Sequence, residues 1–104
     1  MITEDRLNEL IQKAAEITGL DGQYSDISAE YVHTPDKNSI KWMRTFKIIR
    51  LEVSDWVAEM DEDTMTAMLV YFFDRAFNNH KVEMPIAVSA WVDINRHKWT
   101  EVEA

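Results

Sequence analysis

The chain of 104 residues contains no cysteine, only two glycines and only two prolines. Without a thiol it can form neither a disulfide framework nor a cysteine-ligated zinc site, and it has no cysteine nucleophile. Both glycines, Gly19 and Gly22, lie close together, so no glycine-rich loop is available to cradle a phosphate. The serines lack the flanking glycines of a nucleophile elbow. These absences exclude several common designs for an active site.

Length and charge set further bounds on the protein. A chain of this size is expected to form one domain, with a core that needs no disulfide or metal. Its first ten residues, MITEDRLNEL, carry acids where a signal peptide carries bases, so we expect a cytoplasmic protein. Nineteen acidic residues against eleven lysines and arginines give a net charge of −8. That charge disfavours general binding to nucleic acid or to an anionic membrane.

The stretch from Asp61 to Asn79 predicts the central element of the fold. Its middle is apolar on nearly every side, and a helix without a polar face belongs in the interior. Asp61 or Asp63 can cap its start. The apolar run is too short for a membrane span, which needs about 20 apolar residues. We therefore expect a buried helix here and no membrane insertion.

The segments before this helix predict a surface helix followed by a sheet. Apolar residues recur every three or four positions from Thr3 to Thr18, which is typical of an amphipathic helix. Alternation from Ile27 to Thr34 predicts a strand, and turn-forming residues follow it. The apolar run from Ile40 to Val53 changes parity near its middle, which fits either a bulged strand or two strands with a turn near Arg44. We expect a mostly antiparallel sheet.

The last segment fits two structures. Residues 86–94 alternate as in a strand, but Pro85 at their head also fits the first position of a helix. In either case we predict a single α+β domain over residues 1–104. The predicted core consists of Leu10, Ile17, Tyr31, Ile48, Leu51, Trp56, Met65, Leu69, Phe72, Phe73, Ala76 and Trp91.

Two charged segments are candidate binding surfaces. The first is acidic and consists of Glu52, Asp55, Glu59, Asp61, Glu62 and Asp63. The second, from Lys37 to Arg50, concentrates five bases beside Trp42 and Phe46, an arrangement that can bind nucleic acid by stacking. Because the net charge is −8, we favour a basic protein partner at the acidic segment over nucleic acid at the basic one. Homo-oligomerisation stays open.

The segment from Phe46 to Phe77 resembles the central part of small phage-type metallopeptidases of the zincin group. Trp56, the Met60–Glu62 helix start and the apolar residues that follow keep the order and spacing of that family. The H-E-x-x-H motif, whose histidines bind zinc and whose glutamate activates water, falls on residues 71–75. Tyr71 and Arg75 replace the histidines, and Phe72 replaces the glutamate.

This resemblance implies a zincin-like fold of phage or mobile-element origin with an erased metal site. The ending INRHKW, residues 94–99, is similar to the closing helix of the family, except that a glycine is missing, and it favours a helix after Pro85. We therefore predict a non-catalytic interaction protein without a cofactor. A metallopeptidase with another metal site is the alternative. Such a site would need the fold to bring together His33, His80 and His97, which are far apart in the sequence.

Overall fold

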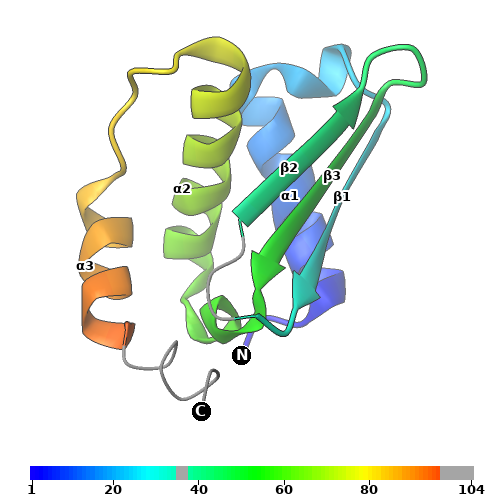
Figure 1. Cartoon of the computed structure of the whole chain (residues 1–104). Helices are drawn as coiled ribbons and strands as arrows, with labels where there is room; N and C mark the ends of the chain where they lie inside the picture. Colours follow the sequence, from blue (N-terminus) through cyan, green and yellow to red (C-terminus); the bar gives the residue numbers. More distant parts are fainter. Residues whose placement is uncertain (35–37, 97–104) are drawn as a thin grey trace.

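A computed structural model describes residues 1–34 and 38–96, in which three α-helices accompany one sheet (Figure 1). The elements in chain order are α1 (Glu4–Thr18), β1 (Asp26–Val32), β2 (Asn38–Met43), β3 (Ile48–Ser54), α2 (Glu62–Phe73) and α3 (Ile86–Asn95). Short 3₁₀ turns follow α1 and β3, and a π-helical turn follows α2. The α+β prediction is confirmed. None of the described helices has the length and apolar character needed to cross a membrane.

Helix α1 has the caps and the apolar stripe that its sequence predicts. The Thr3 hydroxyl accepts a hydrogen bond from the Arg6 amide at 3.2 Å, and Gly19 ends the helix with a φ of 80° that glycine adopts without strain. Its buried side chains are Leu7, Leu10, Ile11, Ala14 and Ala15. Ile17 was expected in this stripe, but it is 62% exposed. It lies in the last turn, at the edge of the stripe, and borders a surface hollow.

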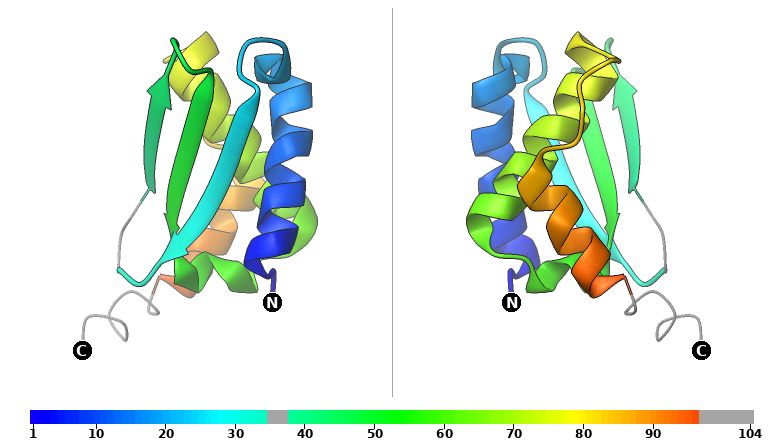
Figure 2. Two further views of the ribbon diagram at one scale, coloured as in Figure 1. Left: turned by 90° about the vertical axis from the view of Figure 1, so that its right-hand side faces the viewer. Right: turned by 90° about the vertical axis from the view of Figure 1, so that its left-hand side faces the viewer.

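The central strand of the sheet is β3, with β1 parallel to it on one side and β2 antiparallel on the other. The sheet is therefore evenly mixed, and the expectation of a mostly antiparallel sheet was wrong. It failed because β2 and β3 form a hairpin that places β3, not β2, beside β1. Figure 2 shows α1 and α2 on the same side of the sheet, with α1 along its β1 edge. Ile48 points away from these helices and is only half-buried.

Helix α2 passes through the centre of the molecule, but only one of its faces is fully buried. Asp61 caps it, because its carboxylate accepts hydrogen bonds from the Thr64 amide at 3.0 Å and the Thr64 hydroxyl at 2.7 Å. These hydrogen bonds lower the pKa of Asp61. Met65, Leu69 and Phe73 are fully buried. The predicted core residues Phe72, near the end of α2, and Ala76, in the π turn after it, are only half-buried, because they line an open groove beside the sheet.

Segment 86–95 is a helix, which decides between the two structures that its sequence allows. Pro85 occupies the N-cap position rather than the first helical position. Val88 is fully buried, and the Trp91 ring stacks on Trp56 with centroids 5.5 Å apart and planes at 15°. Trp91 and Tyr31, both expected in the core, are half-buried at its margin. Helix α3 is therefore attached to the core through a few large side chains.

Candidate functional site

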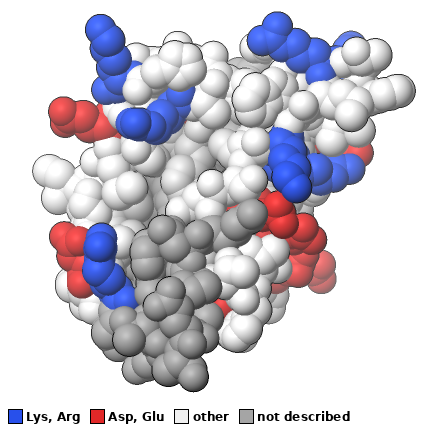
Figure 3. Space-filling model, in the orientation of Figure 1, with Lys and Arg blue, Asp and Glu red and all other residues white. Residues whose placement is uncertain are grey.

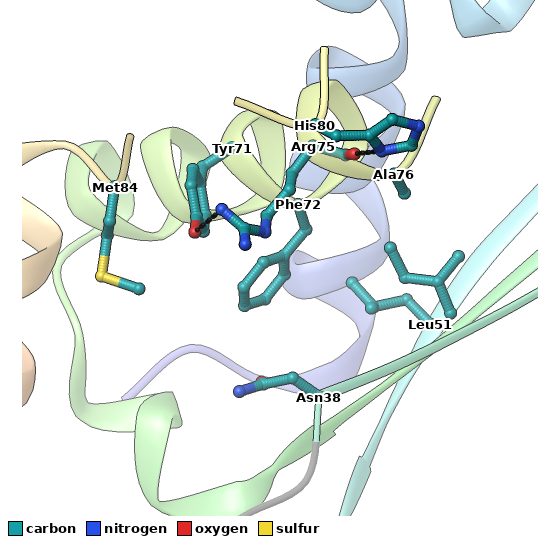
Figure 4. A pocket seen from close by; sticks show the side chains of 9 residues that line it. Asn38, Leu51, Tyr71, Phe72, Arg75, Ala76, His80 and Met84 are labelled. Atoms are coloured by element: carbon teal, nitrogen blue, oxygen red, sulfur yellow. Dashed lines mark hydrogen bonds between the residues drawn. The ribbon is translucent and has the colours of Figure 1, made fainter. Parts of the chain in front are cut away.

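A groove runs between β2 and the C-terminal half of α2 (Figure 4). Its volume is about 560 Å³, within the range of about 300–1,000 Å³ that is typical of ligand sites. Strands β2 and β3, helix α2 with its π turn, and the connection to α3 all contribute to it. The lining residues are Asn38, Ile40, Leu51, Tyr71, Phe72, Arg75, Ala76, His80 and Met84.

The floor and walls of this groove are mainly apolar. Ile40 and Leu51 lie opposite each other in the β2–β3 register and form the sheet side. Phe72 and Ala76, one helical turn apart, form the helix side, and Met84 lies at the outer rim with 38% of its surface exposed. Binding is favoured when a ligand displaces water from apolar walls of this kind, because apolar surface is then removed from water. The groove is suited to bind side chains from another molecule.

Two side chains that can donate hydrogen bonds, Arg75 and His80, lie at the rim of the groove. The Arg75 guanidinium is held by long contacts of 3.4 Å from Nη1 to the Tyr71 hydroxyl and to the Val82 carbonyl. His80 Nδ1 lies 2.8 Å from the Arg75 carbonyl, and because a carbonyl only accepts, Nδ1 carries the proton. Figure 4 shows both side chains at the helix side of the groove. They place hydrogen-bond donors next to an apolar surface.

The two edges of the sheet differ in a way that bears on binding. At the β1 edge, the Asn8 amide binds both backbone groups of Ala29 at 2.9 Å, and Gln12 Nε2 donates to the Ile27 carbonyl at 2.6 Å. Helix α1 thereby occupies the hydrogen-bonding groups that another strand would use. At the β2 edge, the backbone groups that do not face β3 have no partner among the described residues. That open edge borders the groove.

The structure brings the three altered motif positions to this site. Tyr71 and Phe72, near the end of α2, and Arg75, in the π turn after it, all line the groove. Residues 1–34 and 38–96 contain no group of three histidine or acidic side chains placed to hold a metal ion. His33 follows β1 and His80 follows α2, at opposite ends of the molecule, while His97 lies outside the described residues. The described histidines therefore do not form a shared site.

The acidic segment is largely engaged in intramolecular contacts. Four of its six carboxylates have partners: Glu52 with Lys41 at 3.5 Å, Asp55 with His33 at 2.6 Å, Asp61 with Thr64, and Glu62 with Arg6 at 2.6 Å. The hydrogen bonds from Arg6 lower the pKa of Glu62. Glu59 and Asp63 are exposed and have no partner in the described part of the chain. Only these two carboxylates of the described segment are therefore free to form an acidic binding surface.

The basic segment is also divided by the fold. Lys37 lies outside the described residues, and Arg50 forms a two-pronged contact with Asp26, at 3.0 and 3.1 Å, that lowers the pKa of the carboxylate. Trp42 packs on the Phe77 ring at 5.2 Å, whereas Phe46 in the hairpin turn is 67% exposed. Arg44 and Lys47 share that turn. Lys41 and Trp42 in β2 are also exposed, but Lys41 is paired with Glu52 and the Trp42 ring contacts Phe77. The exposed groups of this segment without such a partner are therefore found at the tip of the hairpin.

Comparison with known proteins identifies no relative. No family model matches the chain, and no curated protein or solved structure matches it either. The zincin resemblance and a phage origin stay expectations.

The groove itself was not predicted from sequence. Asn38, His80 and Met84 come from the start of a strand and from an irregular connection, and no periodic pattern joins them to α2. Only Tyr71, Phe72 and Arg75 had been singled out, as altered positions of a motif. An arginine three positions after Phe72 in an otherwise apolar helix was the available signal, since such a helix keeps a charge only where the charge can reach solvent.

Proposed function

We propose that this protein is a non-catalytic interaction module that binds an extended segment of a partner protein along β2. The observation that carries the proposal is the open β2 edge beside the apolar groove, in a sheet whose other edge is covered by Asn8 and Gln12. A segment added to a sheet edge gains main-chain hydrogen bonds, and its alternate side chains can enter pockets beside the strand. Here those side chains would contact Ile40, Leu51 and Phe72.

The side chains of the groove support binding more than catalysis. Within the described part of the chain, the titratable groups of its lining, apart from the Tyr71 phenol, are Arg75 and His80, and no carboxylate is among them. A general base would need to stand within hydrogen-bond reach of a nucleophile or water, and a hydrolytic zinc site would need three fixed ligands. A phenol, a phenyl ring and a guanidinium at the motif positions supply none of these ligands.

Selection from a library of short random peptides tests the proposal. Ala76→Phe would fill the groove from its helix wall, and Ala87→Phe adds the same ring at an exposed position of α3 as a control. We expect the selected peptides to lose binding to Ala76→Phe and to keep it with Ala87→Phe, while melting curves show both variants folded. Peptides that bind both variants equally would refute the groove as their site.

A specific observation favours nucleic acid as the second candidate. The exposed Phe46 ring lies in a turn with Arg44 and Lys47, which have no carboxylate partner among the described residues. An aromatic ring between basic side chains can stack on a nucleobase while the basic side chains contact phosphate. A gel shift at physiological salt that disappears with Phe46→Ala would support this function. The net charge of −8 opposes it, and we expect no shift.

A basic partner at the acidic segment stays a prediction. Glu59 and Asp63 are the carboxylates of that segment available to such a partner without breaking an intramolecular contact. A pull-down from lysate with nuclease treatment tests it, with Glu59→Lys and Asp63→Lys combined as the variant. If this variant still captures the same protein, the acidic segment is not the surface that binds it.

A further inference from the structure

Arg75 has no carboxylate partner in the described part of this strongly acidic chain. Three other arginines do have an acidic partner: Arg6 with Glu9 and Glu62, Arg50 with Asp26, and Arg96 with Asp93. Arg75 instead contacts two neutral oxygens at 3.4 Å, a long distance for a hydrogen bond. A guanidinium has five N–H donors. Most of the hydrogen-bonding capacity of Arg75 is therefore available to a ligand in the groove.

The described lining of the groove carries no acidic side chain to neutralise this arginine, although Asp74 and Glu83 lie nearby in the sequence. Nineteen residues of the chain are acidic, yet among residues 1–34 and 38–96 none of those that line the groove is. His80 lies beside Arg75 at the same rim, bonded to its carbonyl, and Lys81 follows. Figure 3 shows lysine and arginine side chains on both sides of this face, in the half where α2 ends and the hairpin turns. A carboxylate bound in the groove would therefore meet the donors of Arg75 and no described carboxylate of the lining.

Resting on the proposed function, we propose that the groove selects an extended segment that carries an acidic side chain, with its carboxylate bound by Arg75. Side chains of a strand added to β2 alternate between the two faces of the sheet. Those on the helix side enter the groove, where apolar side chains contact Ile40 and Phe72 and the carboxylate binds to Arg75. The planar guanidinium matches a carboxylate with two parallel hydrogen bonds, which gives the site its chemical specificity.

Two capped peptides test this specificity in the full-length protein. In the first peptide, threonine alternates with valine, glutamate and valine. The second peptide is identical except that glutamine replaces the glutamate. We expect fluorescence anisotropy to give a dissociation constant about tenfold lower for the glutamate peptide, in line with a charge-assisted hydrogen bond. The preference should shrink as salt is raised, because the Arg75 side chain is exposed.

Matched variants separate a local contact from the general charge of the protein. Arg75→Gln and Arg44→Gln each remove one positive charge, but Arg44 lies outside the groove, at the hairpin turn. We expect Arg75→Gln to abolish the preference for glutamate and Arg44→Gln to preserve it. Arg75→Lys keeps the charge without the planar fork, and should retain part of the preference.

The outcomes distinguish this inference from the proposed function. An equal affinity for the two peptides, or an equal effect of Arg44→Gln and Arg75→Gln, would overturn the acidic specificity. If library peptides without acidic residues nevertheless bind and are blocked by Ala76→Phe, the groove stands and only the inference fails. If no peptide shows sensitivity to Ala76→Phe, both fail.

Discussion

Replacing Asn8 with alanine should destabilise the fold and expose the covered edge of the sheet. The Asn8 side chain makes two hydrogen bonds of 2.9 Å to the backbone of Ala29. A hydrogen bond of this kind contributes about 0.5–1.5 kcal/mol net, and a buried group left without a partner costs about 1–3 kcal/mol. Because this edge is only partly buried, we expect a loss of roughly 1–3 kcal/mol in the free energy of unfolding for the pair.

Guanidinium and thermal unfolding followed by circular dichroism measure this loss. The melting temperature should fall by roughly 4–8 °C for each kcal/mol in a domain of this size. Gln12→Ala removes one hydrogen bond to the same edge, at the Ile27 carbonyl, and should cost about half as much. The Ala29 amide should also exchange faster with solvent in the Asn8 variant. Wild-type stability together with unchanged exchange at Ala29 would refute the assignment of Asn8 as the cover of this edge.

The other predictions concern the core, a turn, pH and metal. Phe73→Ala should cost about 3–5 kcal/mol in chemical unfolding, and Phe72→Ala clearly less, because Phe73 is fully buried and Phe72 is a groove wall. Lys47→Gly should raise stability by up to about 1 kcal/mol, since Lys47 has a φ of 56° that side chains disfavour. The pKa of Glu62 lies below its ordinary value of 4.5, so its ionised form stabilises the fold above that pH and the contribution disappears as the pH falls. Glu62→Gln should therefore lower the urea midpoint at neutral pH and change it little in strong acid. Metal analysis after purification without added zinc should find less than one ion per chain.

Local signals predicted the helices well. The spacing of apolar residues predicted α1, and its two ends fall at Thr3 and Gly19 as their residue types indicate. The start of α2 was predicted from Asp61, which caps it. The parity change near Ile48 comes from two strands, because a hairpin turn at residues 44–47 separates β2 from β3. In each of these cases the residues that decide the structure are within a few positions of one another.

Long-range relations were beyond the sequence pattern. The parallel pairing of β1 with β3 depends on where the hairpin docks, which no local preference determines. Phe72 has the same apolar character as Phe73, but consecutive residues of a helix point about 100° apart, so one enters the core and the other lines the groove. The site arises from the docking of β2 beside α2, and residues about thirty positions apart meet there.

Residue-resolved hydrogen exchange, with and without a saturating library-selected peptide, tests the central claim most directly. A strand added to β2 would supply partners to the backbone amides of residues 38–43 that do not face β3. The account predicts that these amides gain protection on binding, while those of β1, whose edge is already covered by α1, change little. Protection that appears at β1, or binding without any gain at β2, would contradict it.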